Sequence, residues 1–138
     1  MAKLDPFPGT AIEIGELWST VLNRNQNLLG KCMIVLNRTE IDVGRLTEDE
    51  WSDLLTQIAR LRSALDSLFR PDHYNYAFLM NQDAQVHLHV LPRYKDSREW
   101  DGLQFIDPSF GSMWQVDARV LDSATLSRMA EAIAKSLG

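Results

Sequence analysis

The sequence predicts an α+β fold in which a mostly antiparallel sheet is combined with two helices. Three observations lead to this prediction. Short strand-like stretches open the chain, two longer stretches repeat apolar residues at helical spacing, and two further strand-like stretches are joined by a link too short for a crossover helix. With 138 residues and a mass of 15.8 kDa, the chain is expected to form a single domain over residues 1–138 with its own hydrophobic core.

The first three strands are predicted in the amino-terminal third of the chain. Residues 11–14 and 17–22 are short and rich in apolar and β-branched residues, and a polar turn over residues 23–30 follows them. Residues 32–36 form a continuous apolar run, which is typical of a central strand covered on both faces. The lead-in over residues 1–9 contains two prolines and is expected to be extended.

Two helices are predicted from the spacing of apolar residues and from the residues that open each helix. Thr47 and Glu50 have the form of a capping box, in which a hydroxyl and a carboxylate satisfy the free amides of a helix start. Apolar residues then recur at helical spacing, and the helix is expected to end near Phe69, before Pro71. A second helix is predicted to begin at residues 122–123.

A hairpin is predicted between the two helices. Residues 74–80 alternate as a strand, residues 81–84 make a short polar turn, and residues 85–93 (QVHLHVLPR) follow as the second strand. So short a link joins antiparallel neighbours. Beyond Arg93 the chain is expected to be irregular, with a loop marked by the Asp-Pro pair at 107–108.

The second strand of this hairpin is the most informative part of the chain. Alternate residues of a strand point to the same face, so Gln85, His87 and His89 are expected to form one polar row, backed by an apolar row that faces the core. Neutral imidazole is a nucleophile, a base and a metal ligand near pH 7, so aligned histidines indicate a functional site. Two alternatives remain open. The row could be a solvent-facing surface, or it could bind a metal, although the other soft donors, His73 and Cys32, are isolated.

The histidine strand resembles the signature of the histidine triad (HIT) family of nucleotide hydrolases and transferases, in which three histidines alternate with apolar residues. Gln85 stands in place of the first histidine, as in a bacterial branch of HIT-like proteins, and the continuation over 90–94 (VLPRY) is also similar. The resemblance spans about residues 21–102. It implies a HIT-like fold, with His87 as the nucleophile that forms a covalent nucleotidyl-histidine and His89 as a phosphate contact.

The same resemblance implies a reaction. The expected substrate is a small nucleotide, either a dinucleoside polyphosphate such as a diadenosine polyphosphate or a nucleoside phosphoramidate. Attack by an imidazole needs no metal, so neither a metal nor a cofactor is expected. Gln85 forms hydrogen bonds but cannot carry a proton near pH 7. It therefore either positions the catalytic groups or leaves a catalytically weak nucleotide-binding module, and turnover would separate the two.

Four further residues are expected to contact the substrate, each with a structural alternative. Asn23 follows the second strand, where HIT proteins place a polar side chain on the ribose hydroxyls, although asparagine is also common in such a turn. Asn81 and Gln82 precede the histidine strand, where the family has amides near the phosphates. Arg93 shares the face of His89 and is expected either to attract phosphate or to form a salt bridge with an acidic residue.

Composition excludes several other classes of function. The net charge of −5 argues against a general nucleic-acid partner, which would require a basic face. The single cysteine, Cys32, lies in an apolar run and is expected to be a reduced core residue. Residues 1–9 do not resemble a secretory leader, and no apolar run is long enough to span a membrane, so a cytoplasmic protein is expected.

Two more expectations come from the resemblance. HIT proteins of this size usually pair as homodimers, and the interface is expected at Trp51 or at the apolar end of the second helix. The family often has a basic residue or a histidine near Lys31. The alternative is that Lys31 is no more than a solvated strand end.

Overall fold

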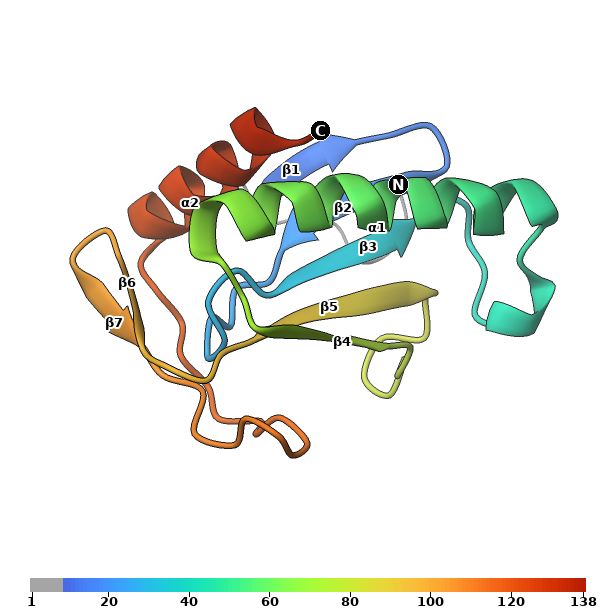
Figure 1. The fold of residues 1–138 in the computed structure, drawn as a ribbon. Helices are drawn as coiled ribbons and strands as arrows, with labels where there is room; N and C mark the ends of the chain where they lie inside the picture. Colours follow the sequence, from blue (N-terminus) through green and yellow to red (C-terminus); the bar gives the residue numbers. More distant parts are fainter. Residues whose placement is uncertain (1–8) are drawn as a thin grey trace.

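The computed structural model describes residues 9–138, so the expectations for residues 1–9, an extended lead-in that does not resemble a secretory leader, lie almost wholly outside the described residues. A five-stranded sheet and two helices that pack on one of its faces form the body of the fold (Figure 1). The predicted α+β fold with two helices is therefore confirmed. In chain order the main elements are β1 (Ala11–Ile14), β2 (Trp18–Leu22), β3 (Cys32–Leu36), α1 (Glu48–Phe69), β4 (His73–Ala77), β5 (His87–Arg93) and α2 (Ser123–Ser136).

The strand order is β1-β2-β3-β5-β4, and every neighbouring pair is antiparallel. The strand β3 is central, as its apolar run predicts, and its Cys32 is fully buried. The histidine strand β5 lies between β3 and β4, where Met33 is opposite His89 and Val35 is opposite His87. Hydrogen bonding on both sides fixes the twist and direction of β5, and thus the direction in which its side chains point.

The two faces of the sheet differ in what covers them. Leu88 and Val90 of β5 belong to the core cluster that includes Leu61 and Leu65 of α1. Each such side chain contributes about 1.5–3 kcal/mol when it is fully removed from water. Because side chains alternate along a strand, the burial of these residues beneath the helices turns the two histidines of β5 to the opposite, open face.

Both helices begin where the sequence predicts, and the first helix also ends there. The hydroxyl of Thr47 accepts a hydrogen bond from the amide of Glu50 (3.1 Å), and the carboxylate of Glu50 accepts one from the amide of Thr47 (2.8 Å), which completes the capping box. Helix α1 ends at Phe69, just before Pro71. The carboxylate of Asp122 caps the start of α2 by accepting a hydrogen bond from the amide of Thr125 (2.8 Å).

The predicted hairpin is wider than the sequence suggests. Strand β4 ends at Ala77 and β5 begins at His87, so residues 78–86 form the connection in place of a four-residue turn. Met80 has a positive φ of 46°, which is incompatible with a continuing strand. Val86 accepts a hydrogen bond from the amide of Leu36 at the end of β3 (3.1 Å) and donates one to the carbonyl of Glu40 (2.8 Å).

The chain beyond Arg93 is also more regular than predicted. A small hairpin, β6 (Arg98–Trp100) and β7 (Leu103–Phe105), turns through Asp101 and Gly102, both with positive φ. An Asp-Gly pair of this kind is the preferred two-residue hairpin turn, so the sequence carried a local signal for it. A short 3-10 helix, η1 (Val43–Arg45), also precedes α1.

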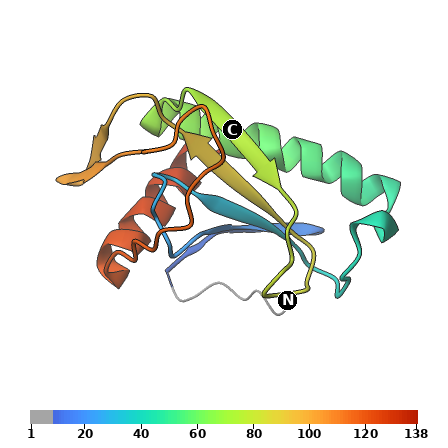
Figure 2. The same ribbon diagram turned by 90° about the horizontal axis from the view of Figure 1, so that it is seen from below.

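After β7 the chain returns across the open face of the sheet before it enters α2 (Figure 2). We call residues 106–121 the return segment. The side-chain amide of Asn25 donates to the carbonyl of Asp117 (3.1 Å), and the side-chain amide of Asn27 donates to the carbonyl of Gln115 (2.8 Å). These contacts bring residues near the carboxyl end of the chain to the turn that follows β2.

Candidate active site

The two histidines of β5 form a hydrogen-bonded pair on the open face. Nδ1 of His87 lies 2.7 Å from the main-chain carbonyl oxygen of Gln85, and Nε2 of His87 lies 3.1 Å from Nε2 of His89. A carbonyl oxygen only accepts hydrogen bonds, so Nδ1 of His87 must carry the proton. The other nitrogen of a neutral ring is then unprotonated. His87 therefore directs the lone pair of Nε2 towards His89, whose Nε2 donates the hydrogen.

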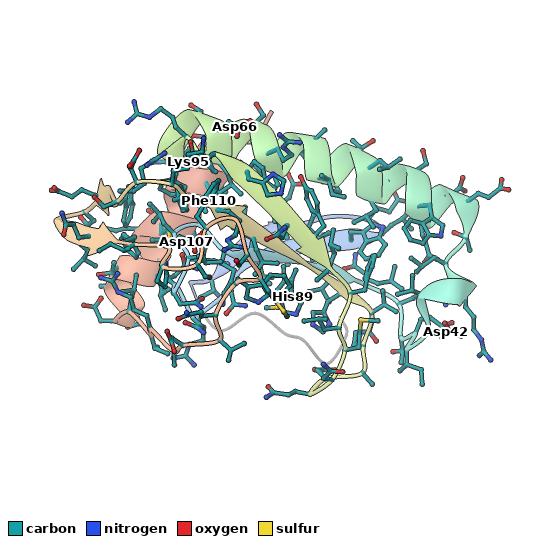
Figure 3. All side chains as sticks on the ribbon, turned by 60° about the horizontal axis from the view of Figure 1, so that its bottom comes forward. Asp42, Asp66, His89, Lys95, Asp107 and Phe110 are labelled. Atoms are coloured by element: carbon teal, nitrogen blue, oxygen red, sulfur yellow. The ribbon has the colours of Figure 1, made fainter. Side chains whose placement is uncertain are left out.

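His89 is a neutral imidazole at physiological pH. Burial, with smaller electrostatic contributions from the neighbouring His87 and Lys31, lowers the pKa of His89 to about 4. A neutral His89 donates a hydrogen bond without adding a charge to the pair. Figure 3 shows His89 on the face of the sheet turned away from α1, beside the segment that carries Asp107 and Phe110.

The histidines line a cleft with two connected parts. The first part has a volume of about 400 Å³ and is lined by His87 and His89 of β5 and by residues 79–83 of the loop after β4. The second part, about 260 Å³, shares His89 with the first and extends to Lys31 and Trp114. Volumes of this size are typical of small-molecule sites. The two parts share Asn23, Leu79, Gln82, His89 and Val116.

Three of the predicted substrate contacts lie together in this cleft. Asn23 lines both parts, Gln82 lines both parts, and Asn81 lines the part that holds His87. The carboxamide oxygen of Asn23 also accepts a hydrogen bond from the amide of Asn25 (2.9 Å), so Asn23 forms the predicted turn as well. Their contacts with a substrate stay predictions.

Gln85 does not extend the polar row, which corrects the sequence prediction. Its side chain is buried, and Nε2 donates to the carbonyls of Leu36 (2.9 Å) and Arg38 (2.7 Å), while Oε1 accepts from the amide of Glu40 (3.2 Å). Both amide hydrogens are thus used by the main chain that leaves β3. The alternation argument fails here because β5 begins only at His87. Gln85 acts on the site through its carbonyl oxygen, as a positioning residue.

Arg93 is a structural residue that forms the salt bridge expected as one of its two alternatives, and it leaves no hydrogen for a phosphate contact. Only 2% of its surface is exposed, and its guanidinium forms a two-point ion pair with Asp107 (2.7 and 3.1 Å). The remaining hydrogens go to Asn75 and to the carbonyls of Ser109 and Ser112, so all five donors are used. Burial favours a raised pKa at Asp107, but hydrogen bonds from Arg93 and from main-chain amides offset it and hold that pKa below its usual range.

Lys31 is the residue whose position the sequence did not indicate. It is 7% exposed, so the alternative of a solvated strand end is wrong. Gly30, with φ of 81°, turns the chain sharply before it, and a Cβ at Gly30 would lie 2.9 Å from the ring of Phe69. Nζ of Lys31 donates to the carboxamide oxygen of Asn27 (2.6 Å), and burial lowers the pKa of Lys31 to about 8.

The soft donors considered for a metal site lie apart in space. Cys32 is buried in β3, and His73 is exposed on β4 opposite Arg93. Across residues 9–138, no three side chains of His, Cys, Asp or Glu are grouped so that they could hold a metal ion. The helices of this part of the chain are also too short or too polar to cross a bilayer.

Comparison with known proteins shows which solved structures share this fold. No family model and no curated protein matches the sequence. Among solved structures, a histidine triad protein from Bradyrhizobium japonicum matches with a TM-score of 0.70 and 22% identity over 93% of this chain and 90% of that chain. A second histidine triad protein, from Sinorhizobium meliloti, matches with a TM-score of 0.71 and 21% identity over 93% of this chain and 89% of that chain. The diadenosine triphosphate hydrolase of Plasmodium falciparum matches with a TM-score of 0.66 and 13% identity over 94% of this chain and 76% of that chain. The chain has the histidine triad fold.

The role of Arg93 can be tested by its removal. Arg93→Met leaves the carboxylate of Asp107 buried without its counter-ion, so we expect a loss of about 3–5 kcal/mol in the free energy of unfolding, measured by urea denaturation. Arg128→Met is the matched control, because Arg128 pairs with Asp101 at the exposed surface, where a pair contributes about 0–1 kcal/mol. Equal losses in the two variants would contradict the structural role of Arg93.

Proposed function

We propose that this protein is a nucleotide hydrolase or nucleotidyl transferase of the HIT type that works through a covalent nucleotidyl-His87. One observation supports this proposal above the others. His87 presents an unprotonated Nε2 at a cleft, in an orientation set by the Gln85 carbonyl. The histidine triad fold supports it further, as does the name of one structural match, a diadenosine triphosphate hydrolase. The proposed substrates are a dinucleoside polyphosphate or a nucleoside phosphoramidate.

The proposed reaction has two displacements at one phosphorus. Nε2 of His87 attacks the phosphate that carries the nucleoside, and the bond from phosphorus to the leaving group breaks with its electron pair on the leaving atom. The imidazole becomes positively charged, and the hydrogen bond from Nδ1 to the Gln85 carbonyl stabilises that charge. Water then attacks the same phosphorus, the bond to Nε2 breaks, and the nucleoside monophosphate is released with a proton.

The remaining residues of the cleft receive roles that fit their positions. The Nε2–H of His89, which points at His87 in the free protein, turns to a phosphate oxygen when substrate binds and so frees the nucleophile. Asn81 and Gln82, on the loop that faces the histidines, contact the phosphates. Asn23, at the junction of the two parts of the cleft, contacts the ribose.

The alternative of a catalytically weak nucleotide-binding module was suggested by the glutamine at position 85. The structure weakens that reason, because the Gln85 side chain is occupied by main-chain carbonyls away from the imidazole pair. A glutamine at position 85 therefore removes no acid or base from the hydrogen-bonded pair of His87 and His89. The catalytic proposal is therefore favoured.

Replacement of His87 tests the proposal. His87→Ala should abolish hydrolysis, because no other group of the cleft has the same orientation, while circular dichroism and thermal unfolding should show an intact fold. Turnover of diadenosine triphosphate and of adenosine phosphoramidate is measured by chromatography. His73→Ala, at the exposed histidine of β4, is the control and should retain full activity. Full activity in His87→Ala would exclude the covalent mechanism, and a wild-type protein that binds nucleotide without turnover would establish the binding module.

We also propose that the protein forms a homodimer, as the resemblance implies. The support is an apolar surface on α1 beside the edge strand β4. Trp51 (41% exposed) packs edge-on against Phe78 (centroids 6.1 Å apart), and Leu55 (67% exposed) follows one turn later. The apolar residues of α2, by contrast, are buried in the core, which favours the Trp51 side over the second helix.

The dimer proposal predicts a specific disruption. Leu55→Glu places a charge in the proposed interface and should shift the protein from dimer to monomer in sedimentation experiments at micromolar concentration. Ile14→Glu is the control, because Ile14 is comparably exposed (60%) but lies on β1 at the other edge of the sheet. A monomeric wild-type protein, or a Leu55→Glu variant that remains dimeric, would refute this interface.

The cellular setting remains a prediction. The thiol of Cys32 is free and buried, and burial raises its pKa, so it is an unreactive core group that suits the proposed cytoplasmic location. The net charge of −5 supports a small nucleotide, and not a nucleic acid, as the partner.

A further inference from the structure

Lys31 is a buried cation without an anionic partner. Among the described residues, the other buried ionised side chains are Glu50, Arg93 and Asp107, and each of them forms an ion pair. The hydrogen bond of Lys31 Nζ goes instead to the neutral carboxamide of Asn27. A buried ammonium is costly unless an opposite charge compensates it. The burial of Lys31 therefore indicates a place for an anion.

That place lies next to the catalytic pair. Lys31 and His89 line the same part of the cleft, and the charge of Lys31 contributes to the lowered pKa of His89, so the two groups are close enough to interact. His89 also lines the part that holds His87. A chain of phosphates that begins at His87 can thus pass His89 and reach Lys31 within one continuous cleft.

The surrounding structure holds Lys31 in this position. The carboxamide oxygen of Asn27 accepts from Lys31 Nζ, while its nitrogen donates to the carbonyl of Gln115 in the return segment. The return segment is in turn tied to β5 through the ion pair of Arg93 with Asp107. Asn27 thus holds Lys31, the return segment holds Asn27, and β5 holds the return segment. A side chain fixed in this way is typical of a preorganised binding group, which loses little entropy when the ligand binds.

We propose that Lys31 binds the phosphate adjacent to the one that His87 attacks, and that the enzyme therefore prefers nucleoside polyphosphates to nucleoside phosphoramidates. This inference rests on the function proposed above. In a polyphosphate, the P–O bond breaks with its electron pair on the leaving phosphate, and the ammonium of Lys31 stabilises that negative charge. In a phosphoramidate, the leaving nitrogen takes up a proton from solvent as the P–N bond breaks and departs as a neutral amine, which carries no negative charge for Lys31 to bind.

The kinetic test compares the two substrate classes in two variants. Lys31→Met keeps the length of the side chain and suits a buried site, and it should lower kcat/KM for diadenosine triphosphate by about a hundredfold, the loss typical of one preorganised electrostatic group. The same variant should change kcat/KM for adenosine phosphoramidate by less than about threefold, which is far smaller than the loss expected for diadenosine triphosphate. Lys31→Arg keeps the charge and should restore part of the polyphosphate activity. Lys95→Met, at an exposed lysine, is the control and should match the wild type for both substrates.

Three kinetic outcomes would overturn the inference. They are an unchanged kcat/KM for diadenosine triphosphate in Lys31→Met, an equal loss for both substrates, and a larger loss for the phosphoramidate, which would make Lys31 a proton donor to the amine.

A binding measurement separates failure of this inference from failure of the proposed function. The dissociation constants of ADP and AMP are measured by calorimetry, which needs no turnover. The wild-type protein should bind ADP at least about tenfold more tightly than AMP, as expected for one added charge-assisted hydrogen bond, and Lys31→Met should lose that difference. If the wild-type protein binds the two nucleotides equally, the inference is wrong whether or not the variants fold and whether or not the protein is an enzyme.

Discussion

The hydrogen bond from Nδ1–H of His87 to the main-chain carbonyl of Gln85 is the interaction on which the candidate site depends. It fixes the tautomer of His87 and leaves Nε2 unprotonated at the cleft. The carbonyl is itself held in place, because the Gln85 side chain is bonded to the main chain that leaves β3. Glutamine supplies this anchoring without any titratable group.

A second constraint comes from the ion pair of Arg93 with Asp107. Buried and bonded through all five guanidinium hydrogens, Arg93 holds the return segment against β5. That segment completes the cleft with Trp114 and Val116 and orients Asn27 against Lys31. The charge of Arg93, on the strand that carries the histidines, therefore stabilises the fold, whereas Lys31, just before β3, is a cation that lines the cleft.

The features that the sequence predicted well are those set by local patterns. Apolar periodicity, the capping box at Thr47 and the polar cap at Asp122 predicted the strands of the main sheet and both long helices within a few residues. Strand alternation brought His87 and His89 together, but it failed for Gln85, which precedes the strand. The partner of Arg93 and the burial of Lys31 depend on how the return segment folds back over the sheet, and no local spacing encodes that long-range contact.

The tautomer of His87 is the most direct test of this account. Nitrogen-15 NMR of the histidine side chains, assigned with the His87→Ala variant, reports which ring nitrogen carries the proton. We expect His87 to be protonated at Nδ1 and unprotonated at Nε2 at pH 8. His89 should remain neutral as the pH falls to 5, because burial lowers its pKa to about 4. A His87 ring protonated at Nε2 with a free Nδ1 would contradict the proposed nucleophile.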